Sequence, residues 1–258
     1  MNLILPKTDD LRFFHLGRIA AETGVSTLEY NANSPLDKGV YLFPFTYREK
    51  ELLPILDSLP EQSFVFIGKS TEKIRQVAAF KKLWLTAFLE NDRYLTKNAE
   101  HTAEGVLAEI LAKTDKRLSD LCLLIYGYGN CGRAIARLLW LCGCEIWVWS
   151  RERGKRLAEE DGFNLYPAPK LGFGMFDGVI NTVPDPIFPS SLLSTIRRDA
   201  SFFQVASGFS GIDPSTAEDL GFSFYPLHGL PGKYCPLSEA QILWEEMGGV
   251  LQNQRSTL

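Results

Sequence analysis

The sequence predicts an α/β protein of two domains, each built on a parallel sheet. Short apolar runs alternate with helical stretches over the first hundred residues, and the alternation resumes from residue 118. Such alternation is typical of parallel sheets covered by helices. We expect 1–100 to form an N-terminal α/β domain, 101–117 a connecting helix, and 118–236 a second α/β domain.

The composition is that of an ordinary globular chain, and it excludes several classes of function. The chain has 258 residues, 45% hydrophobic and 22% charged, with a net charge of -4, which argues against a nucleic-acid partner. The most apolar run, "LLWLCGCEIWVW", is too short and interrupted to span a membrane, and "MNLILPKTDD" does not resemble a signal peptide. Five cysteines without a regular framework indicate reduced thiols, a cytoplasmic location and no metal site.

In the first domain, apolar runs predict strands and amphipathic stretches predict helices. Strands are expected at "NLIL", "GVYLFPF", "SFVFIG" and "LWLTAF", and helices at "DLRFFHLGRIAAETG", "EKELLPILDSL" and "STEKIRQVAAFKK". The connecting helix contains "TAEGVLAEILAK". A last helix, 237–251, is predicted to begin with Ser238 as N-cap, with Gln241 completing a capping box, and to return to the first domain.

The second domain opens with a glycine turn. "CLLIYGYGNCGRAIARLL" holds Gly127, Gly129 and Gly132 in G-x-G-x-x-G spacing, with Asn130 and Cys131 between the last two. An apolar strand precedes the turn, an amphipathic helix follows it, and a second strand, "EIWVW", comes next. This context indicates a Rossmann-type dinucleotide site, in which the helix N-terminus offers its free N–H groups to a pyrophosphate. A turn of the same form that holds no nucleotide remains the alternative.

The end of "EIWVW" indicates which nucleotide is preferred. NAD sites usually carry an acidic residue there, but this chain has Ser150 and Arg151, with Arg153 and Lys155 just beyond. A hydroxyl and a guanidinium can bind a 2′-phosphate, so we predict NADP(H) over NAD(H). The alternative is that these are solvated residues at the start of a helix.

Two later strands end in small polar residues. "FDGVINTVPDPIF" ends a strand at Asn181 and Thr182, and "ASFFQVASGFSGID" ends another near Ser207. Ligands of open parallel sheets lie beyond the carboxyl ends of the strands, so we expect Asn181 and Thr182 to edge the cofactor and Ser207 to line the site. A plain polar turn explains the first pair equally well.

Several stretches, in order, resemble the family of the dipicolinate synthase A subunit: "TAEG", the glycine turn, "INTVP", "ASGFSGID" and above all "GLPGKYCPLSEAQIL". The resemblance implies a nicotinamide-dependent oxidoreductase of sporulation that forms pyridine-2,6-dicarboxylate from a small cyclic dicarboxylate. It implies a partner, the flavoprotein-like B subunit, and a fold similar to those of shikimate and 2-hydroxyacid dehydrogenases. The N-terminal domain then lies on the substrate side.

The chain departs from the family pattern at four places. His101 stands where the family has proline before "TAEG", and Asn130 stands where the usual nucleotide turn has arginine. "ASGFSG" lacks an expected proline and glycine, and "PLSEA" replaces Pro-Lys-Thr-Ala-Gly. A lysine is lost and Glu239 is gained, a change that weakens an anion site. We therefore keep two alternatives: a non-catalytic nucleotide-binding partner or regulatory subunit, and an enzyme like shikimate dehydrogenase. Homo-oligomer formation is left open.

The candidate site residues are titratable or small groups, most of them in or beside "TAEG" and "GLPGK". His101 and His228 can exchange a proton near neutral pH, and Lys233 can bind a carboxylate, so these three are the catalytic candidates; a structural histidine and a solvated lysine are the alternatives. The substrate-binding candidates are Thr46, Thr102, Glu104, Ser207, Gly229, Pro231 and Gly232.

Overall fold

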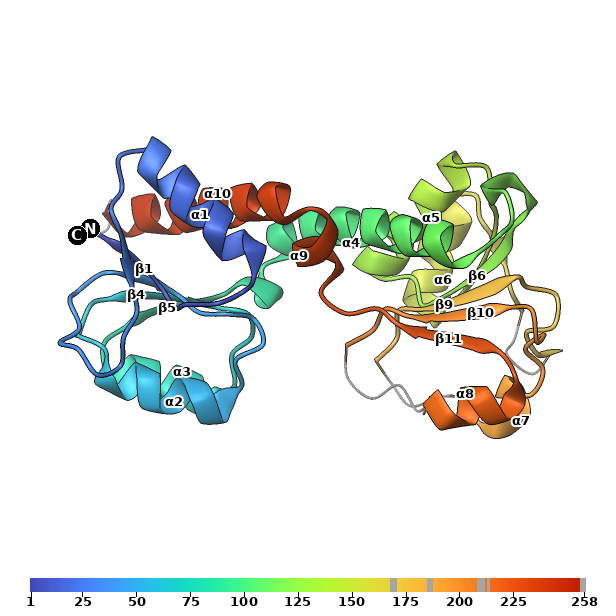
Figure 1. Ribbon diagram of the computed structural model, residues 1–258, viewed down its shortest axis with the longest axis horizontal. Helices are drawn as coiled ribbons and strands as arrows, with labels where there is room; N and C mark the ends of the chain where they lie inside the picture. Colours follow the sequence, from blue (N-terminus) through green and yellow to red (C-terminus); the bar gives the residue numbers. More distant parts are fainter. Residues whose placement is uncertain (168–170, 185–187, 208–211, 213, 256–258) are drawn as a thin grey trace. The chain divides into compact units, whose positions relative to one another are not determined.

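The computed structural model of the chain describes residues 1–167, 171–184, 188–207, 212 and 214–255. Contacts between Cα atoms divide the chain into two compact units: Met1–Asn98 with Cys235–Leu258, and Ala99–Tyr234. Each unit contains a parallel sheet with helices on both faces (Figure 1). The predicted fold class, two α/β domains of which the second is Rossmann-type, is confirmed.

The first unit has a five-stranded parallel sheet in the order β2-β1-β3-β4-β5. Its strands are β1 (Leu3–Leu5), β2 (Thr27–Glu29), β3 (Val40–Leu42), β4 (Phe64–Ile67) and β5 (Trp84–Ala87). Helices α1 (Leu11–Glu22) and α10 (Pro236–Arg255) cover one face, and α2 (Glu49–Ser58) and α3 (Glu72–Phe80) cover the other (Figure 1).

The central strands of this sheet were predictable because they are buried on both faces, which makes them continuously apolar. Strand β2 was missed because all three of its residues are exposed, so the sequence shows no apolar run there. Helix α1 begins after Asp10, whose carboxylate accepts the Arg12 N–H at 3.0 Å as an N-cap.

The second unit has a six-stranded parallel sheet in the order β11-β10-β9-β6-β7-β8. Its strands are β6 (Cys122–Tyr126), β7 (Glu145–Trp149), β8 (Asn164–Leu165), β9 (Gly178–Asn181), β10 (Ser201–Gln204) and β11 (Ser223–Pro226). This is the strand order of dinucleotide-binding Rossmann sheets. Successive strands are added on one side of β6 as far as β8 and on its other side from β9 to β11, so the strand order reverses between β6 and β9. The crevice at that reversal is where such sheets place their ligand.

Helices cover both faces of this sheet in the described part of the unit. Helices α4 (Asp92–Lys113), α5 (Asn130–Leu141) and α6 (Glu152–Glu160) share one apolar core with the sheet, and α7 (Ser190–Leu193) and α8 (Pro214–Leu220) cover the opposite face (Figure 1). The short helix α9 (Leu230–Tyr234) follows β11. Single 3₁₀ turns occur at Phe88–Glu90 and Leu118–Asp120.

Two helix boundaries differ from those predicted. Helix α4 spans Asp92–Lys113, so it begins well before residue 101 and ends before 117. Helix α10 begins at Pro236, so Ser238 is not its N-cap and the proposed capping box is wrong. Proline suits the first helical position because its ring already holds a helical φ, and the Cys235 carbonyl accepts the Glu239 N–H at 2.9 Å as the first turn closes.

Candidate functional site

The glycine turn connects β6 to α5 with contacts that leave no room for side chains. Gly127 has a φ of 99°, and a Cβ there would lie 2.6 Å from Thr182 Oγ1. A Cβ on Gly132 would lie 2.1 Å from the Gly127 carbonyl oxygen. Both distances are far below van der Waals contact, so the first and last glycines of the motif are required for α5 to start against the strand.

The middle glycine of the motif faces open space. Gly129 is the N-cap residue of α5, and no heavy atom lies within 4 Å of the position its Cβ would take. No side chain caps the helix at this residue, so backbone N–H groups of the first turn keep their capacity to donate. Asn130 is exposed and Cys131 is half-buried beside it. The geometry suits the approach of an anion such as a pyrophosphate.

Thr182 links the ends of β6 and β9 at the reversal of strand order. Its N–H donates to the Tyr126 carbonyl at 2.9 Å, and its hydroxyl lies 3.2 Å from both the Tyr126 and Gly127 carbonyl oxygens. The side chain is only partly buried. Thr182 therefore lies directly at the glycine turn, where a cofactor-edging residue was expected.

Asn181 lies at the same strand end but is not exposed. It is fully buried, and its amide nitrogen donates to the Val183 carbonyl at 3.0 Å and to Gln204 Oε1 at 2.8 Å. Its Oδ1 accepts the Val183 N–H at 3.0 Å. These bonds engage both ends of the carboxamide and shape the loop after β9. Asn181 thus positions the segment that holds Thr182. Gln204, which sequence reasoning missed, supports it from β10.

At the end of β7, the residues predicted to select NADP surround the start of α6. Ser150 is half-buried, Arg151 is the exposed N-cap residue of α6, and Arg153 and Lys155 are exposed in its first turns. Gly154 was missed by sequence reasoning: a Cβ there would lie 2.2 Å from Ser150 Oγ and 3.0 Å from the Tyr128 carbonyl oxygen. Glycine at this position lets α6 begin close to the glycine turn.

A buried carboxylate joins α5 to the end of α6. Asp161 accepts hydrogen bonds from Tyr128 Oη and Arg133 Nε, both at 2.7 Å, and from Arg137 at 2.7 Å. The Arg133 bond is the main reason that the pKa of Asp161 lies far below its usual value. Because Tyr128 belongs to the glycine turn, this cluster braces the turn against both helices.

Helix α4 contacts the nucleotide turn through Thr102. This side chain is buried, and it forms a hydrogen bond with the Cys131 thiol at the start of α5. Burial raises the pKa of the Cys131 thiol, although the Thr102 bond acts in the opposite direction. His101, half-buried, precedes Thr102 on α4, and Glu104 is exposed two residues later. The structure therefore brings Thr102 of α4 to Cys131, one of the predicted cofactor residues.

Helix α9 lies directly on α4. A Cβ on Gly105 would be 2.7 Å from Leu230 Cβ, so the glycine of "TAEG" permits the close approach. Nearby, the Lys233 ammonium donates to Glu109 Oε1 at 2.6 Å, and Tyr234 Oη donates to the same oxygen at 2.7 Å. The Glu109 bond raises the pKa of Lys233 and lowers that of Glu109. Lys233 is therefore a paired cation, which favours charge stabilisation over proton transfer.

The remaining candidates are less engaged. His228 and Gly229 are exposed after β11, Gly229 having a φ of 63°, and Pro231 and Gly232 are half-buried in α9. Ser207 is exposed after β10, and the rest of "ASGFSG", 208–211, lies outside the described residues. Thr46 belongs to the first unit, where it is exposed in the turn after β3, at the carboxyl edge of that sheet.

A polar cluster in the first unit was not predicted. Glu239 is completely buried in α10, and its carboxylate accepts a hydrogen bond from Tyr94 Oη. Burial, and next the Glu239 charge, raises the pKa of Tyr94, so the phenol stays protonated. Tyr94 and Glu239 are 145 residues apart, and no local pattern connects them. This pair accounts for the acid gained in "PLSEA".

The described part of the chain has no group of three or more histidine, cysteine, aspartate or glutamate side chains that could hold a metal ion. Within the same residues, no helix is both long and apolar enough to cross a membrane.

No protein-family model matches the chain. The A subunit of dipicolinate synthase from Bacillus subtilis (strain 168) is 29% identical over 192 residues, which cover 73% of this chain and 64% of that protein. The NADP(+) shikimate dehydrogenase of Thermus thermophilus is 35% identical over 78 residues, covering 26% of this chain and 30% of that protein.

Solved structures of the same kinds of protein are similar to this chain in fold. The A chain of dipicolinate synthase from Bacillus subtilis superposes with a TM-score of 0.83 at 20% identity, covering 100% of this chain and 98% of that one. D-lactate dehydrogenase from Escherichia coli superposes with a TM-score of 0.66 at 12% identity, covering 98% of each chain. The chain thus has a dehydrogenase-like fold and is a homologue of the dipicolinate synthase A subunit.

Proposed function

We propose that this protein is an NADP(H)-dependent oxidoreductase of the cytoplasm that acts on a small cyclic dicarboxylate, such as a dihydro- or hydroxytetrahydrodipicolinate. The observation that carries the proposal is the glycine turn. It lies at the reversal of the Rossmann strand order, with two glycines in obligatory close contact and the third facing open space at a helix N-terminus.

The residues after β7 support NADP(H) over NAD(H). Ser150 and Arg151 occupy the place where NAD sites carry an acid, and Arg153 adds a second exposed guanidinium. A guanidinium can bind a 2′-phosphate through two parallel hydrogen bonds. Glu152 is exposed in the first turn of α6 and offsets part of this charge.

When bound, the nicotinamide coenzyme supplies or accepts a hydride. The chain's own residues then hold the reactants and transfer one proton. We assign the proton to His101 in preference to His228. His101 is half-buried on α4 beside Thr102, which contacts the nucleotide turn, whereas His228 is exposed. Lys233 contributes positive charge, because its pKa is raised by the bond to Glu109.

Partner and biological role rest on the homologue alone. The relative is named as one of a set of subunits, so we propose a flavoprotein-like partner, the B subunit, together with a role in spore formation. A small anionic substrate suits the Lys233 ammonium in α9.

The test is turnover of a hydroxytetrahydrodipicolinate-type substrate with NADP⁺, by the chain alone and with a flavoprotein-like partner. We expect NADPH formation, and His101→Gln should lower kcat by about 100-fold or more with NADPH affinity unchanged. His228→Gln is the matched control and should have a smaller effect. If His228→Gln alone abolishes turnover, the proton assignment is wrong.

A second candidate is a non-catalytic nucleotide-binding partner. The pairing of Lys233 with Glu109 favours it, since this ion pair reduces the positive charge free to bind a dicarboxylate. Tight NADPH binding without turnover in any combination of substrate and partner supports this candidate and contradicts the first. Turnover of shikimate in the same assay would instead favour a shikimate dehydrogenase activity.

A further inference from the structure

The first unit contains an apolar cavity at the amino edge of its sheet, opposite the carboxyl edge where Thr46 lies. Its volume is about 470 Å³, within the range of small-molecule pockets, about 300–1,000 Å³. The first residues of four strands, Leu3, Val40, Phe64 and Trp84, line it and are neighbours in the sheet register. All of its lining residues belong to the first unit.

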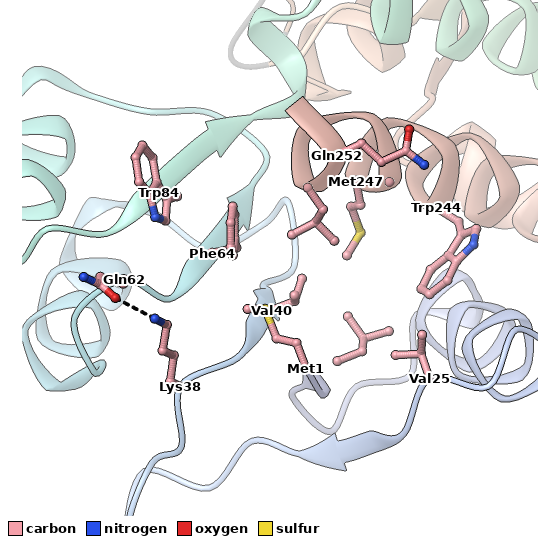
Figure 2. A pocket seen from close by; sticks show the side chains of 13 residues that line it. Met1, Val25, Lys38, Val40, Gln62, Phe64, Trp84, Trp244, Met247 and Gln252 are labelled. Carbon is pink, nitrogen blue, oxygen red and sulfur yellow. Dashed lines mark hydrogen bonds between the residues drawn. The ribbon is translucent and has the colours of Figure 1, made fainter. Parts of the chain in front are cut away.

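The opposite wall is one face of α10. Trp244, Met247, Gly248 and Leu251 lie at helical spacing and line the cavity. Figure 2 shows Trp244 and Met247 among its lining side chains. Among the described residues, no heavy atom lies within 4 Å of the position that a Cβ on Gly248 would take. Glycine inside a helix costs about 1 kcal/mol relative to alanine, and no contact with the described part of the chain requires it here. The glycine leaves the space that a bound molecule could fill.

Polar groups occur at one side of the cavity. Lys38 Nζ donates to Gln62 Oε1 at 2.6 Å, and both side chains are exposed (Figure 2). Gln62 is held with a φ of 60°, and its backbone N–H donates to the Lys82 carbonyl at 2.9 Å. The Gln62 amide nitrogen remains able to donate while its oxygen accepts from Lys38. No aspartate or glutamate is among the described residues that line the cavity.

We propose that this cavity binds an amphiphilic monocarboxylate. Its apolar body lies among Phe64, Trp244 and Met247 and covers Gly248. Its carboxylate lies at the Lys38 ammonium and the Gln62 amide. Two tryptophans provide large apolar contacts, and two methionines provide side chains that adapt to the ligand. This site lies outside the glycine turn and is independent of the proposed oxidoreductase activity.

The first experiment titrates the full chain with decanoate and follows tryptophan fluorescence, since Trp84 and Trp244 line the cavity. Decanol tests the apolar body alone, and acetate tests the carboxylate alone. We expect saturable binding of decanoate at one site, weaker binding of decanol and none of acetate. Lys38→Gln should weaken decanoate binding by about two- to five-fold, as expected for an exposed charge pair, and leave decanol binding unchanged.

The second experiment uses a matched pair of glycines. Gly248→Leu fills the cavity and should abolish binding of both decanoate and decanol. Gly249→Leu is the control, since Gly249 is the next residue of α10, is exposed and does not line the cavity; it should bind as the parent does. Far-UV circular dichroism and the Tm of each variant report that the first unit is folded.

Three results would overturn the proposal: no saturable binding of decanoate, equal binding by the parent and Gly248→Leu, or equal loss in both glycine variants. A fourth is a difference in sedimentation, in which the parent chain is a dimer and Gly248→Leu is a monomer. That outcome would assign the cavity to a second copy of the chain.

Discussion

At the residue scale, the three motif glycines differ in what surrounds them. Substitutions at them should therefore affect nucleotide binding and folding stability differently. A methyl group on Gly129 meets open space, but on Gly132 it would lie 2.1 Å from a carbonyl oxygen. Gly129→Ala should therefore leave the unfolding free energy nearly unchanged and weaken NADPH binding by about tenfold, because the methyl blocks the approach of the pyrophosphate.

Gly132→Ala should behave differently, with a loss of about 1–3 kcal/mol in the free energy of unfolding, as for other overpacked sites. Urea unfolding and NADPH titration of both variants check the pair of expectations. Unchanged NADPH affinity in Gly129→Ala would show that no nucleotide phosphate lies at this turn.

Asp161 gives a pH-dependent prediction. Its pKa in the folded protein lies below the ordinary value of 3.8, chiefly through Arg133, so its bonds stabilise the fold above that pH. Protonation removes this contribution as the pH falls through the folded pKa. Asp161→Asn should lower the free energy of unfolding by about 1–2 kcal/mol at pH 7, and the difference from the parent should shrink as the pH falls below 3.8.

The matched control is Asp199→Asn, which removes an ion pair with Arg197 at an exposed carboxylate. Exposed ion pairs contribute little to stability, so the Tm of Asp199→Asn should stay close to that of the parent both at pH 7 and below pH 3.8. An Asp161→Asn Tm equal to that of the parent at pH 7 would contradict a bracing role for the Tyr128 cluster.

Several residue roles could be predicted because they belong to contiguous patterns. The spacing of the three motif glycines and the basic residues after β7 are readable from a dozen neighbouring letters. The contacts of Asn181, Lys233 and Glu239 could not be read from the sequence, since each depends on a partner brought close by the fold. Asn181 binds Gln204, Lys233 binds Glu109, and Glu239 binds Tyr94.

At the scale of elements, the contact of α9 with α4 places "GLPGK" relative to "TAEG". Gly105→Leu adds a side chain where Leu230 Cβ already lies 2.7 Å away. We expect α9 to be displaced, with a loss of about 1–3 kcal/mol in stability, earlier cleavage near Lys233 in limited proteolysis, and lower turnover. Ala108→Leu is the control, since Ala108 is a half-buried residue on the same helix. Unchanged protease sensitivity in Gly105→Leu would contradict this contact.

Helices and strands were predictable where the element is strongly buried and its apolar pattern is clear. Strands β1, β3, β4 and β6 are short continuous apolar runs, as expected for strands buried on both faces. The start of α10 was misplaced because Ser238 offers a good cap locally, while the fold uses Pro236 instead. Such choices depend on the free energy of the folded chain and not on local preference alone.

At the scale of the whole molecule, the chain has two units with separate cores. The first is completed by the C-terminal segment, and the second holds the glycine turn, Thr102 and the α9 residues. The candidate cofactor residues and the candidate residues on α4 and α9 thus lie in one unit. Thr46 and the Glu239–Tyr94 pair belong to the other. The sequence predicted both sheets, but the buried acid and the apolar cavity required the fold.

The central claim, that the glycine turn binds NADP(H) in a working oxidoreductase, is tested most directly by calorimetric titration of the purified chain. NADPH and NADH are each titrated with and without dipicolinate. The account predicts that NADPH binds about tenfold or more tightly than NADH, that Arg151→Ala removes most of this preference, and that dipicolinate strengthens NADPH binding. Absence of binding by either nucleotide, or a preference for NADH, would contradict it.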